Sequence, residues 1–301
     1  MQTFDRGSAG SARVAIVGGI HGDEPAGVRI VERLAGELAP LDRSDGEGET
    51  GGLVRLILAN EPAIEAETRY TDADLNRAFP GDPESNEYER ALAPRLTAEL
   101  EGMDAVLALH TSHSAPPPFA IYSDPTESVR RSVTGMPVEY VVDSGELRST
   151  TLDSVVPHTV SIEVGRQGSE EAVAFGYEAC LAFLRAHGAL DDEPPTFTET
   201  TVVAGDEEVP KGGGEPRVHF ANFEAIPPGS VFAEDDVYTH RVEEEGVVPI
   251  LASEHGYEEI FGIYGRVQGV MEPPASAVDG TTATQKSTEE STEKSAEESA
   301  E

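Results

Sequence analysis

Residues 12–25 read ARVAIVGGIHGDEP, and this stretch predicts a buried strand that runs into a tight turn and then a helix. The glycines permit the sharp turn, and Pro25 suits the first position of a helix. His21 and Glu24 therefore lie at the carboxyl end of a strand, which is the edge where sites form in open α/β sheets. A His-x-x-Glu pair alone is weak evidence, because Asp23 and Glu24 can also complement the dipole of the helix.

The same alternation continues through the first 190 residues and predicts an α/β layer fold. Short β-branched or Leu-rich runs predict strands, and the amphipathic stretches between them predict helices. The expected strands lie at 13–17, 53–59, 105–109, 120–122, 139–142 and 160–164, and the expected helices at 25–38, 86–101, 126–135 and 170–187. Residues 42–52 are rich in Gly, Asp and Glu and predict a solvated loop.

A change of composition after the last predicted helix divides the chain into four parts. Residues 1–190 form the predicted catalytic domain, and the sequence DDEPP predicts a linker at 191–196 because proline disfavours a helix before it. Residues 197–274 contain short strands broken by Gly and Pro, which predicts a small all-β domain. Residues 275–301 are rich in Ser, Thr, Glu and Ala, which predicts a disordered acidic tail.

The charge balance excludes several classes of partner. Fifty-seven acidic residues against 21 basic ones give a net charge of −36, and no basic stripe is present. We therefore expect no binding to nucleic acid or to an anionic membrane surface. No apolar run of about 18 residues predicts a membrane span, and the first fifteen residues lack the order of a signal peptide. Cys180 is the single cysteine, which excludes an internal disulfide and favours the cytoplasm.

The basic residues are themselves unusual, since only three of the 21 are lysines. Abundant Asp and Glu with scarce Lys resembles proteins from organisms that hold molar salt in the cytoplasm, where self-repulsion is screened. We therefore hypothesise a halophilic source, and an acidic mesophilic protein is the alternative. Equal resistance to unfolding in dilute buffer and in molar KCl would exclude the halophilic hypothesis.

A third candidate ligand follows the apolar run AVLAL at 105–109, where His110 is expected to reach the same sheet edge as His21 and Glu24. Catalytic zinc sites use three nitrogen or oxygen ligands and keep one position open for water, and two His with one Glu is a known set. His113 competes as the third ligand. It precedes the loop SAPPP, which favours a place at the mouth of the site instead.

Residues 159–165 read TVSIEVG and place one carboxylate, Glu163, between Ile162 and Val164. Because side chains alternate along a strand, Glu163 could lie on a solvated face of the sheet. If it faces a metal instead, its expected task is to take a proton from water and pass it to a leaving nitrogen.

The irregular segment RYTDADLNRAFPG carries two arginines and an asparagine, namely Arg69, Asn76 and Arg77. Guanidinium groups pair with carboxylates in a bidentate fork, so this segment is suited to holding a substrate carboxylate. The alternative is internal pairing of an arginine with Asp72 or Asp74.

Taken in order, the motifs GGIHGDE, RYTDADLNRAFPGD, LALHTS and SIEVG resemble the succinylglutamate desuccinylase and aspartoacylase family. This family is a branch of the zinc-carboxypeptidase-like hydrolases, and the resemblance covers about residues 12–190 well and the β domain loosely. It implies a mixed, mostly parallel sheet flanked by helices, with a small C-terminal all-β domain. It also implies that His21, Glu24 and His110 hold one Zn²⁺ per chain.

The resemblance assigns further roles to residues around that metal. It implies that Glu163 is the general base, that Arg69 polarises the scissile amide oxygen, and that Asn76 and Arg77 bind the substrate carboxylate.

Residues that select the substrate are the point where this sequence departs from the family. In aspartoacylases, additional Tyr and Arg residues bind the second carboxylate of aspartate. Arg148, Tyr257 and Tyr264 are the candidates here, and either tyrosine could equally be a packing residue. The acyl group, whether acetyl or succinyl, stays open.

The expected activity is hydrolysis of the amide bond of a small anionic N-acyl amino acid such as N-acetylaspartate or N-succinylglutamate. A metallocarboxypeptidase acting on short peptides would use the same metal ligands, but the DLNR and IEVG contexts favour a deacylase. A non-catalytic metal-binding homologue is the third reading, and the presence of Glu163 argues against it. Assembly into a homo-oligomer stays open.

Overall fold

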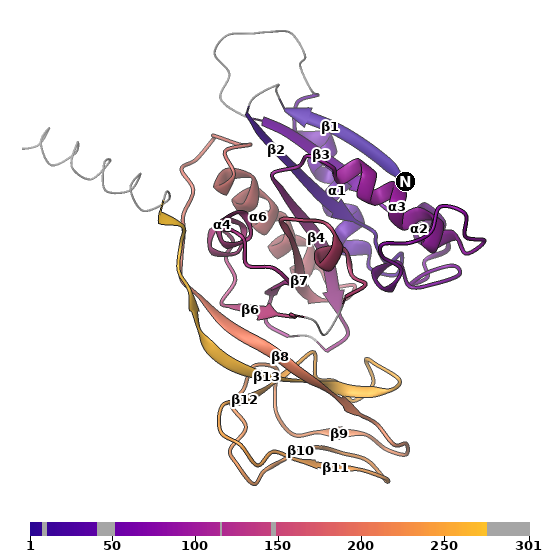
Figure 1. The fold of residues 1–301 in the computed structure, drawn as a ribbon, viewed down its shortest axis with the longest axis vertical. Coiled ribbons are helices and arrows are strands. Elements are labelled where there is room, and N and C mark those ends of the chain that lie inside the picture. The colour runs from indigo at the N-terminus through magenta and orange to yellow at the C-terminus, as the bar shows by residue number, and fades with distance from the viewer. Residues whose placement is uncertain (8–10, 41–51, 115, 146–148, 276–301) are drawn as a thin grey trace, which may run out of the picture.

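The computed structural model describes residues 1–7, 11–40, 52–114, 116–145 and 149–275, and a ten-stranded sheet forms its centre (Figure 1). The strand order across this sheet is β1-β3-β2-β4-β7-β5-β6-β8-β13-β12. The strands are β1 (Gln2–Gly7), β2 (Ala12–Gly18), β3 (Gly52–Leu58), β4 (Ala105–Ser112), β5 (Phe119–Tyr122), β6 (Tyr140–Asp143), β7 (Thr159–Arg166), β8 (Thr200–Pro210), β12 (Val247–Ile250) and β13 (Ile260–Met271).

The sheet is mixed and mostly parallel, as the sequence predicts. β3, β2, β4 and β7 pair in parallel, and so do β5 with β6 and β6 with β8. β1 pairs antiparallel with β3, β5 with β7, and β13 with both β8 and β12. Parallel strands with both faces covered are continuous apolar runs, and all eight residues of β4 are buried.

Helices cover both faces of the sheet. They are α1 (Pro25–Glu37), α2 (Glu61–Ala66), the 3₁₀ helix η1 (Leu75–Arg77), α3 (Tyr88–Leu100), α4 (Glu127–Gly135), α5 (Leu152–Val155) and α6 (Glu170–Ala186). Alternation along β2 divides the core, because Val14 and Ile16 pack with α1, α4 and α6. Ala15 and Val17 face the opposite side and pack with α3.

Local signals explain where the helices begin and why the edge strand β1 is absent from the sequence prediction. Pro25 starts α1, and the Ser169 hydroxyl accepts a hydrogen bond from the Ala172 N–H at the start of α6. β1 carries a single apolar side chain, Phe4, so its sequence lacks the pattern of a buried strand. It adds to the edge of the sheet by pairing with β3.

Residues 197–274 contain strands and no helix, as predicted, but they contribute to two sheets. β8 pairs with β6, so the central sheet continues across the predicted linker at 191–196. A separate three-stranded sheet contains β9 (Arg217–Val218), β10 (Val231–Glu234) and β11 (Thr239–Arg241), drawn in orange in Figure 1. The division into domains at 191–196 therefore stays a prediction about folding units.

Some sequence predictions fall outside the described residues. The loop predicted at 42–52 and the tail predicted at 275–301 lie almost entirely there, and so does Arg148. Within the part of the chain that the structure describes, no helix has both the length and the apolar character needed to span a membrane.

Candidate metal centre and active site

The turn after β2 is held against two other segments. Gly19 has a φ of +66°, which favours glycine, and a Cβ on Gly22 would lie 2.1 Å from the carbonyl group of Ala63. The Gly22 N–H also donates to the carbonyl of Arg69 at 3.3 Å. This packing fixes the turn that carries His21, and only glycine fits at its closest approach to α2.

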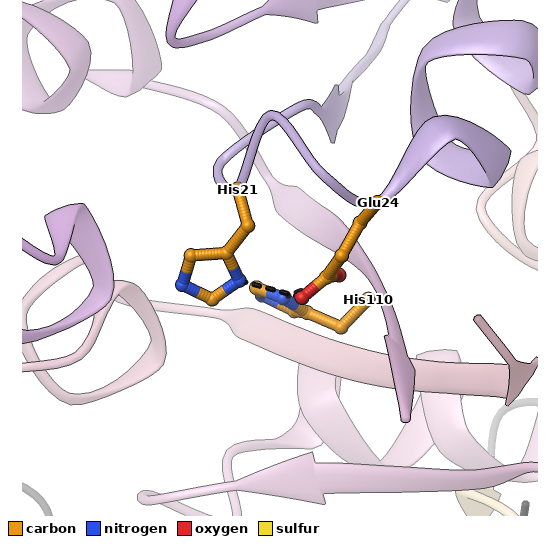
Figure 2. A group of neighbouring side chains, drawn as sticks. All are labelled: His21, Glu24 and His110. Atoms are coloured by element: carbon orange, nitrogen blue, oxygen red, sulfur yellow. Dashed lines mark hydrogen bonds and ion pairs between the residues drawn. The ribbon is translucent and has the colours of Figure 1, made fainter. Parts of the chain in front are cut away.

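Three buried side chains converge at the carboxyl end of β2 and β4 (Figure 2). His21 Nδ1 lies 2.7 Å from one Glu24 carboxylate oxygen, and His110 Nδ1 lies 3.4 Å from the other. The exposed fractions of His21, Glu24 and His110 are 3 %, 4 % and 5 %. Their ligand atoms all lie within 4.8 Å of one another, so the sequence-predicted trio forms a group that could hold a metal ion.

Electrostatics couple these groups strongly. Burial alone would lower the pKa of His21, but the Glu24 and Asp74 carboxylates outweigh it and raise the pKa to about 9. Burial would raise the pKa of Glu24, yet His21 and His110 hold it well below its usual range. The site therefore stabilises positive charge beside Glu24, and a bound cation would displace the proton from His21.

The donor set fits zinc. Two imidazoles and one carboxylate are a common catalytic zinc set, and they leave a position open. His110 Nε2 is fully buried and has no hydrogen-bond partner among the described residues. His21 Nε2 lies 2.9 Å from Asp74 Oδ1, which is the arrangement of a carboxylate that orients a metal-binding histidine. Sequence reasoning considered Asp74 only as an arginine partner and did not identify this second role.

Zinc binding is expected to raise the melting temperature of the metal-free protein. At a free zinc concentration of 100 times Kd the stabilisation is about 2.7 kcal/mol, which corresponds to about 5 to 10 °C. We expect His110→Ala to lose this response, because the site then has two ligands. His113→Ala is the matched control, since His113 is exposed and lies outside the group of three. A response lost in His113→Ala and kept in His110→Ala would reverse the assignment.

Glu163 lies inside β7 and beside this group. Ile162 and Val164 pack in the core, so alternation turns Glu163 to the opposite face of the sheet. Its register partner on β4 is His110, and paired residues in a parallel ladder share a face. Glu163 lines the same cavity as the three candidate ligands. The solvated-face alternative therefore does not describe its position.

Arg69, Asn76 and Arg77 also line that cavity. The Arg69 guanidinium donates to Asp74 at 3.2 Å through two nitrogens and lies 3.5 Å from Glu24, so the internal pairing considered from sequence is present. Asn76 Oδ1 accepts a hydrogen bond from the Leu152 N–H at 3.1 Å, which directs the amide Nδ2 elsewhere.

The two C-terminal tyrosines occupy different places. Tyr257 lines the cavity, whereas Tyr264 packs against Phe232 with their ring centroids 5.3 Å apart. Burial, with a further effect of Glu207, raises the pKa of Tyr264 to about 12. Of these two tyrosines, Tyr257 is therefore the one at the cavity.

A cavity of about 500 Å³ joins these parts into one site. Its lining includes the turn after β2, the segment 69–77, strands β4, β5, β7 and β8, helix α5 and the segment before β13. A space of this size suits a small molecule.

Comparison with known proteins identifies relatives of this chain. An N-acyl-aromatic-L-amino acid amidohydrolase (carboxylate-forming) B of Danio rerio is 29% identical over 175 residues, which cover 51% of this chain and 54% of that protein. An N-alpha-acetyl-L-2,4-diaminobutyric acid deacetylase of Halomonas elongata is 29% identical over 196 residues, which cover 59% and 55%. The chain thus spans about half the length of these relatives.

A solved structure shares the fold. The succinylglutamate desuccinylase/aspartoacylase from Rhodobacter sphaeroides superposes with a TM-score of 0.68 at 22% identity, covering 88% of this chain and 87% of that one. Residues 11–185 match the family model of the succinylglutamate desuccinylase/aspartoacylase catalytic domain. Because that match covers more than half of the 301 residues, the chain belongs to the succinylglutamate desuccinylase/aspartoacylase family.

Proposed function

We propose that this chain is a zinc-dependent amidohydrolase that removes an acyl group, acetyl or succinyl, from an N-acyl amino acid. The observation that carries the proposal is the convergence of His21, Glu24 and His110 in a cavity that Glu163 and Arg69 also line. Family membership supports the same reaction class, and the names of the two relatives describe deacylation of N-acyl amino acids.

Zinc held by His21, Glu24 and His110 would supply a Lewis acid that activates water and the amide carbonyl. Glu163 then takes a proton from the attacking water and delivers it to the departing amine nitrogen. Arg69 donates hydrogen bonds to the oxygen on which negative charge develops, and Asp74 holds its guanidinium in place.

Asn76 and Arg77 hold the α-carboxylate of the substrate in this proposal. Asn76 is 9% exposed, and its Oδ1 is engaged by the Leu152 N–H, which leaves its Nδ2 to donate to the substrate. Arg77 is exposed within the cavity lining and supplies a guanidinium. The carboxylate requirement separates this site from one that accepts any amide.

Hydrolysis of N-acyl amino acids by the zinc-loaded protein tests the proposal. The panel contains N-acetyl and N-succinyl amino acids beside short peptides with free C-termini, and released amine is measured. We expect turnover of N-acyl amino acids and slower or no turnover of peptides. Cleavage of peptides alone would favour a metallocarboxypeptidase, and zinc binding without any turnover would favour a non-catalytic homologue.

The assay also addresses the cellular setting. We expect the protein to work in a salt-rich cytoplasm, a proposal supported by the net charge of −36, the scarcity of lysine and the single cysteine. Running the panel in molar KCl and in dilute buffer checks the salt requirement, because self-repulsion is screened only in the first. Equal activity and stability in both would contradict it.

A further inference from the structure

The charges that line the cavity are unevenly distributed. Among the described residues, seven carboxylates and two guanidinium groups line it. Both arginines, Arg69 and Arg77, come from the segment 69–77, and Arg69 is already engaged by Asp74 and Glu24. In the proposed function, the substrate carboxylate occupies the basic part of this lining. A second carboxylate would meet no other arginine and no lysine among the described lining residues.

Asp153 is a buried acid of this lining that lies outside the group of three candidate ligands. It is 9% exposed and lines the cavity. Its Oδ1 accepts a hydrogen bond from the Ser161 hydroxyl at 3.1 Å, and its Oδ2 accepts one from the Ser123 hydroxyl at 2.8 Å. No lysine or arginine in the described part of the chain forms an ion pair with it. The two hydroxyl groups satisfy its hydrogen bonds but supply no positive charge. Burying a carboxylate without a cationic partner costs free energy.

Asp153 lies near two residues that take part in the proposed reaction. Its hydrogen-bond partner Ser161 is two residues before Glu163 on β7, so the two side chains share a face. The preceding residue, Leu152, donates its N–H to Asn76. Asp153 is thus a neighbour both of the proposed base and of a residue that binds the substrate carboxylate. A substrate side chain is the part of the ligand that remains to be placed there.

Two further observations about the cavity lining point to a bound ligand. Glu208 on β8 and the consecutive acids Glu258 and Glu259 before β13 are exposed and line the cavity, and none of the ion pairs in the described residues includes them. Thr111 also lines the cavity, is 6% exposed, and its buried Oγ1 has no hydrogen-bond partner among the described residues. A bound molecule can supply that partner.

From these contacts we infer that the amino acid part of the substrate carries a positively charged side chain. The ammonium group donates hydrogen bonds to Asp153 and compensates its buried charge, while Glu208, Glu258 and Glu259 attract the cation to the entrance. N-acylated 2,4-diaminobutyrate, ornithine and lysine belong to this class. This class differs from the dicarboxylic examples expected from the sequence, and the inference rests on the proposed deacylase function.

Substrate preference of the zinc-loaded full chain tests the inference. We compare kcat/KM for the Nα-acetyl derivatives of 2,4-diaminobutyrate, ornithine and lysine with that for uncharged N-acetylnorleucine and for N-acetylaspartate and N-succinylglutamate. We expect at least about a tenfold preference for a cationic side chain over norleucine. Asp153→Asn should remove most of this preference, so that kcat/KM falls far more for the cationic substrates than for N-acetylnorleucine. A preference ratio does not change with the fraction of folded protein, so a merely structural effect leaves it unaltered.

The control is Asp124→Asn, an exposed aspartate outside the cavity lining, which should keep the wild-type preference. Calorimetric binding of free 2,4-diaminobutyrate and aspartate to the same proteins gives a readout that does not need turnover. Tighter binding of diaminobutyrate without hydrolysis of any acyl compound would support the specificity and reject the deacylase function. Hydrolysis with a preference for dicarboxylic substrates, or a cationic preference that Asp153→Asn retains, would overturn the inference alone.

Discussion

Replacement of Glu163 by glutamine is expected to lower kcat for N-acyl amino acid hydrolysis by about 10²–10⁴-fold, with little change in KM. Glutamine keeps the shape of the side chain beside His110 but cannot accept a proton from water. Because Glu163 lies outside the group of three candidate ligands, we expect the zinc content of the variant to stay at the wild-type level. Steady-state kinetics and metal analysis on the same preparation measure both quantities.

Glu171→Gln is the matched control for this experiment. Glu171 is exposed in the first turn of α6, and it is not part of the cavity lining. We expect wild-type kinetics from it. If Glu163→Gln retained wild-type turnover, Glu163 would have no part in proton transfer. If it lost turnover together with zinc, Glu163 would belong to the metal site instead of acting as the base.

The parts of the site that follow directly from sequence are those that depend on neighbours along the chain. The strand, the glycine turn and Pro25 place His21 and Glu24 at a sheet edge. All eight residues of β4 are buried, and this explains why the apolar run before His110 indicates its position. β4 extends beyond the predicted strand at 105–109, since its polar end still pairs with β7 as far as Ser112. His110 therefore lies within the strand and not just after it.

The parts that sequence reasoning missed depend on contacts between distant segments. Asp74 reaches His21 across 53 positions, and Asp153 reaches the cavity through the short helix α5, which carries too few residues to show a periodic pattern. The polar β8 and the segment before β13 contribute acids to a cavity whose chemistry resides in the first 190 residues. No local pattern predicts such meetings, because they follow from the sheet order.

Glu89 is a further residue of this kind, and it organises the segment that carries Arg69 and Asp74. It lies on α3 with no exposed surface. One carboxylate oxygen accepts hydrogen bonds from the Thr71 N–H at 2.7 Å, the Thr71 hydroxyl at 2.8 Å and Asn60 Nδ2 at 3.1 Å. The other accepts from the N–H groups of residues 72 and 73, both at 3.0 Å. Three consecutive backbone N–H groups thus depend on one side chain.

Glu89→Ala is therefore expected to lower the free energy of unfolding by about 3 to 5 kcal/mol at pH 7. The substitution leaves several buried donors without an acceptor, and each such group costs about 1–3 kcal/mol. Glu89→Gln keeps the volume of the side chain, but its amide NH₂ group would face N–H donors. We therefore expect its free energy of unfolding to lie between those of wild type and Glu89→Ala. Urea-induced unfolding at fixed KCl concentration measures these differences. Glu65→Ala, an exposed glutamate on α2, is the control and should change stability by less than about 0.5 kcal/mol.

The pH dependence of the Glu89 effect separates the lost carboxylate from lost packing. Burial alone would raise the pKa of Glu89, but the N–H groups of residues 71–73 and Asn60 outweigh it and lower the pKa from 4.5 to about 2. A carboxyl with a lowered native pKa contributes stability that is complete above about pH 4.5 and is lost as the pH falls towards 2. The difference between wild type and Glu89→Gln should therefore shrink between pH 5 and pH 3. A difference that stays constant over this range would assign the effect to packing and contradict the role of the charged carboxylate.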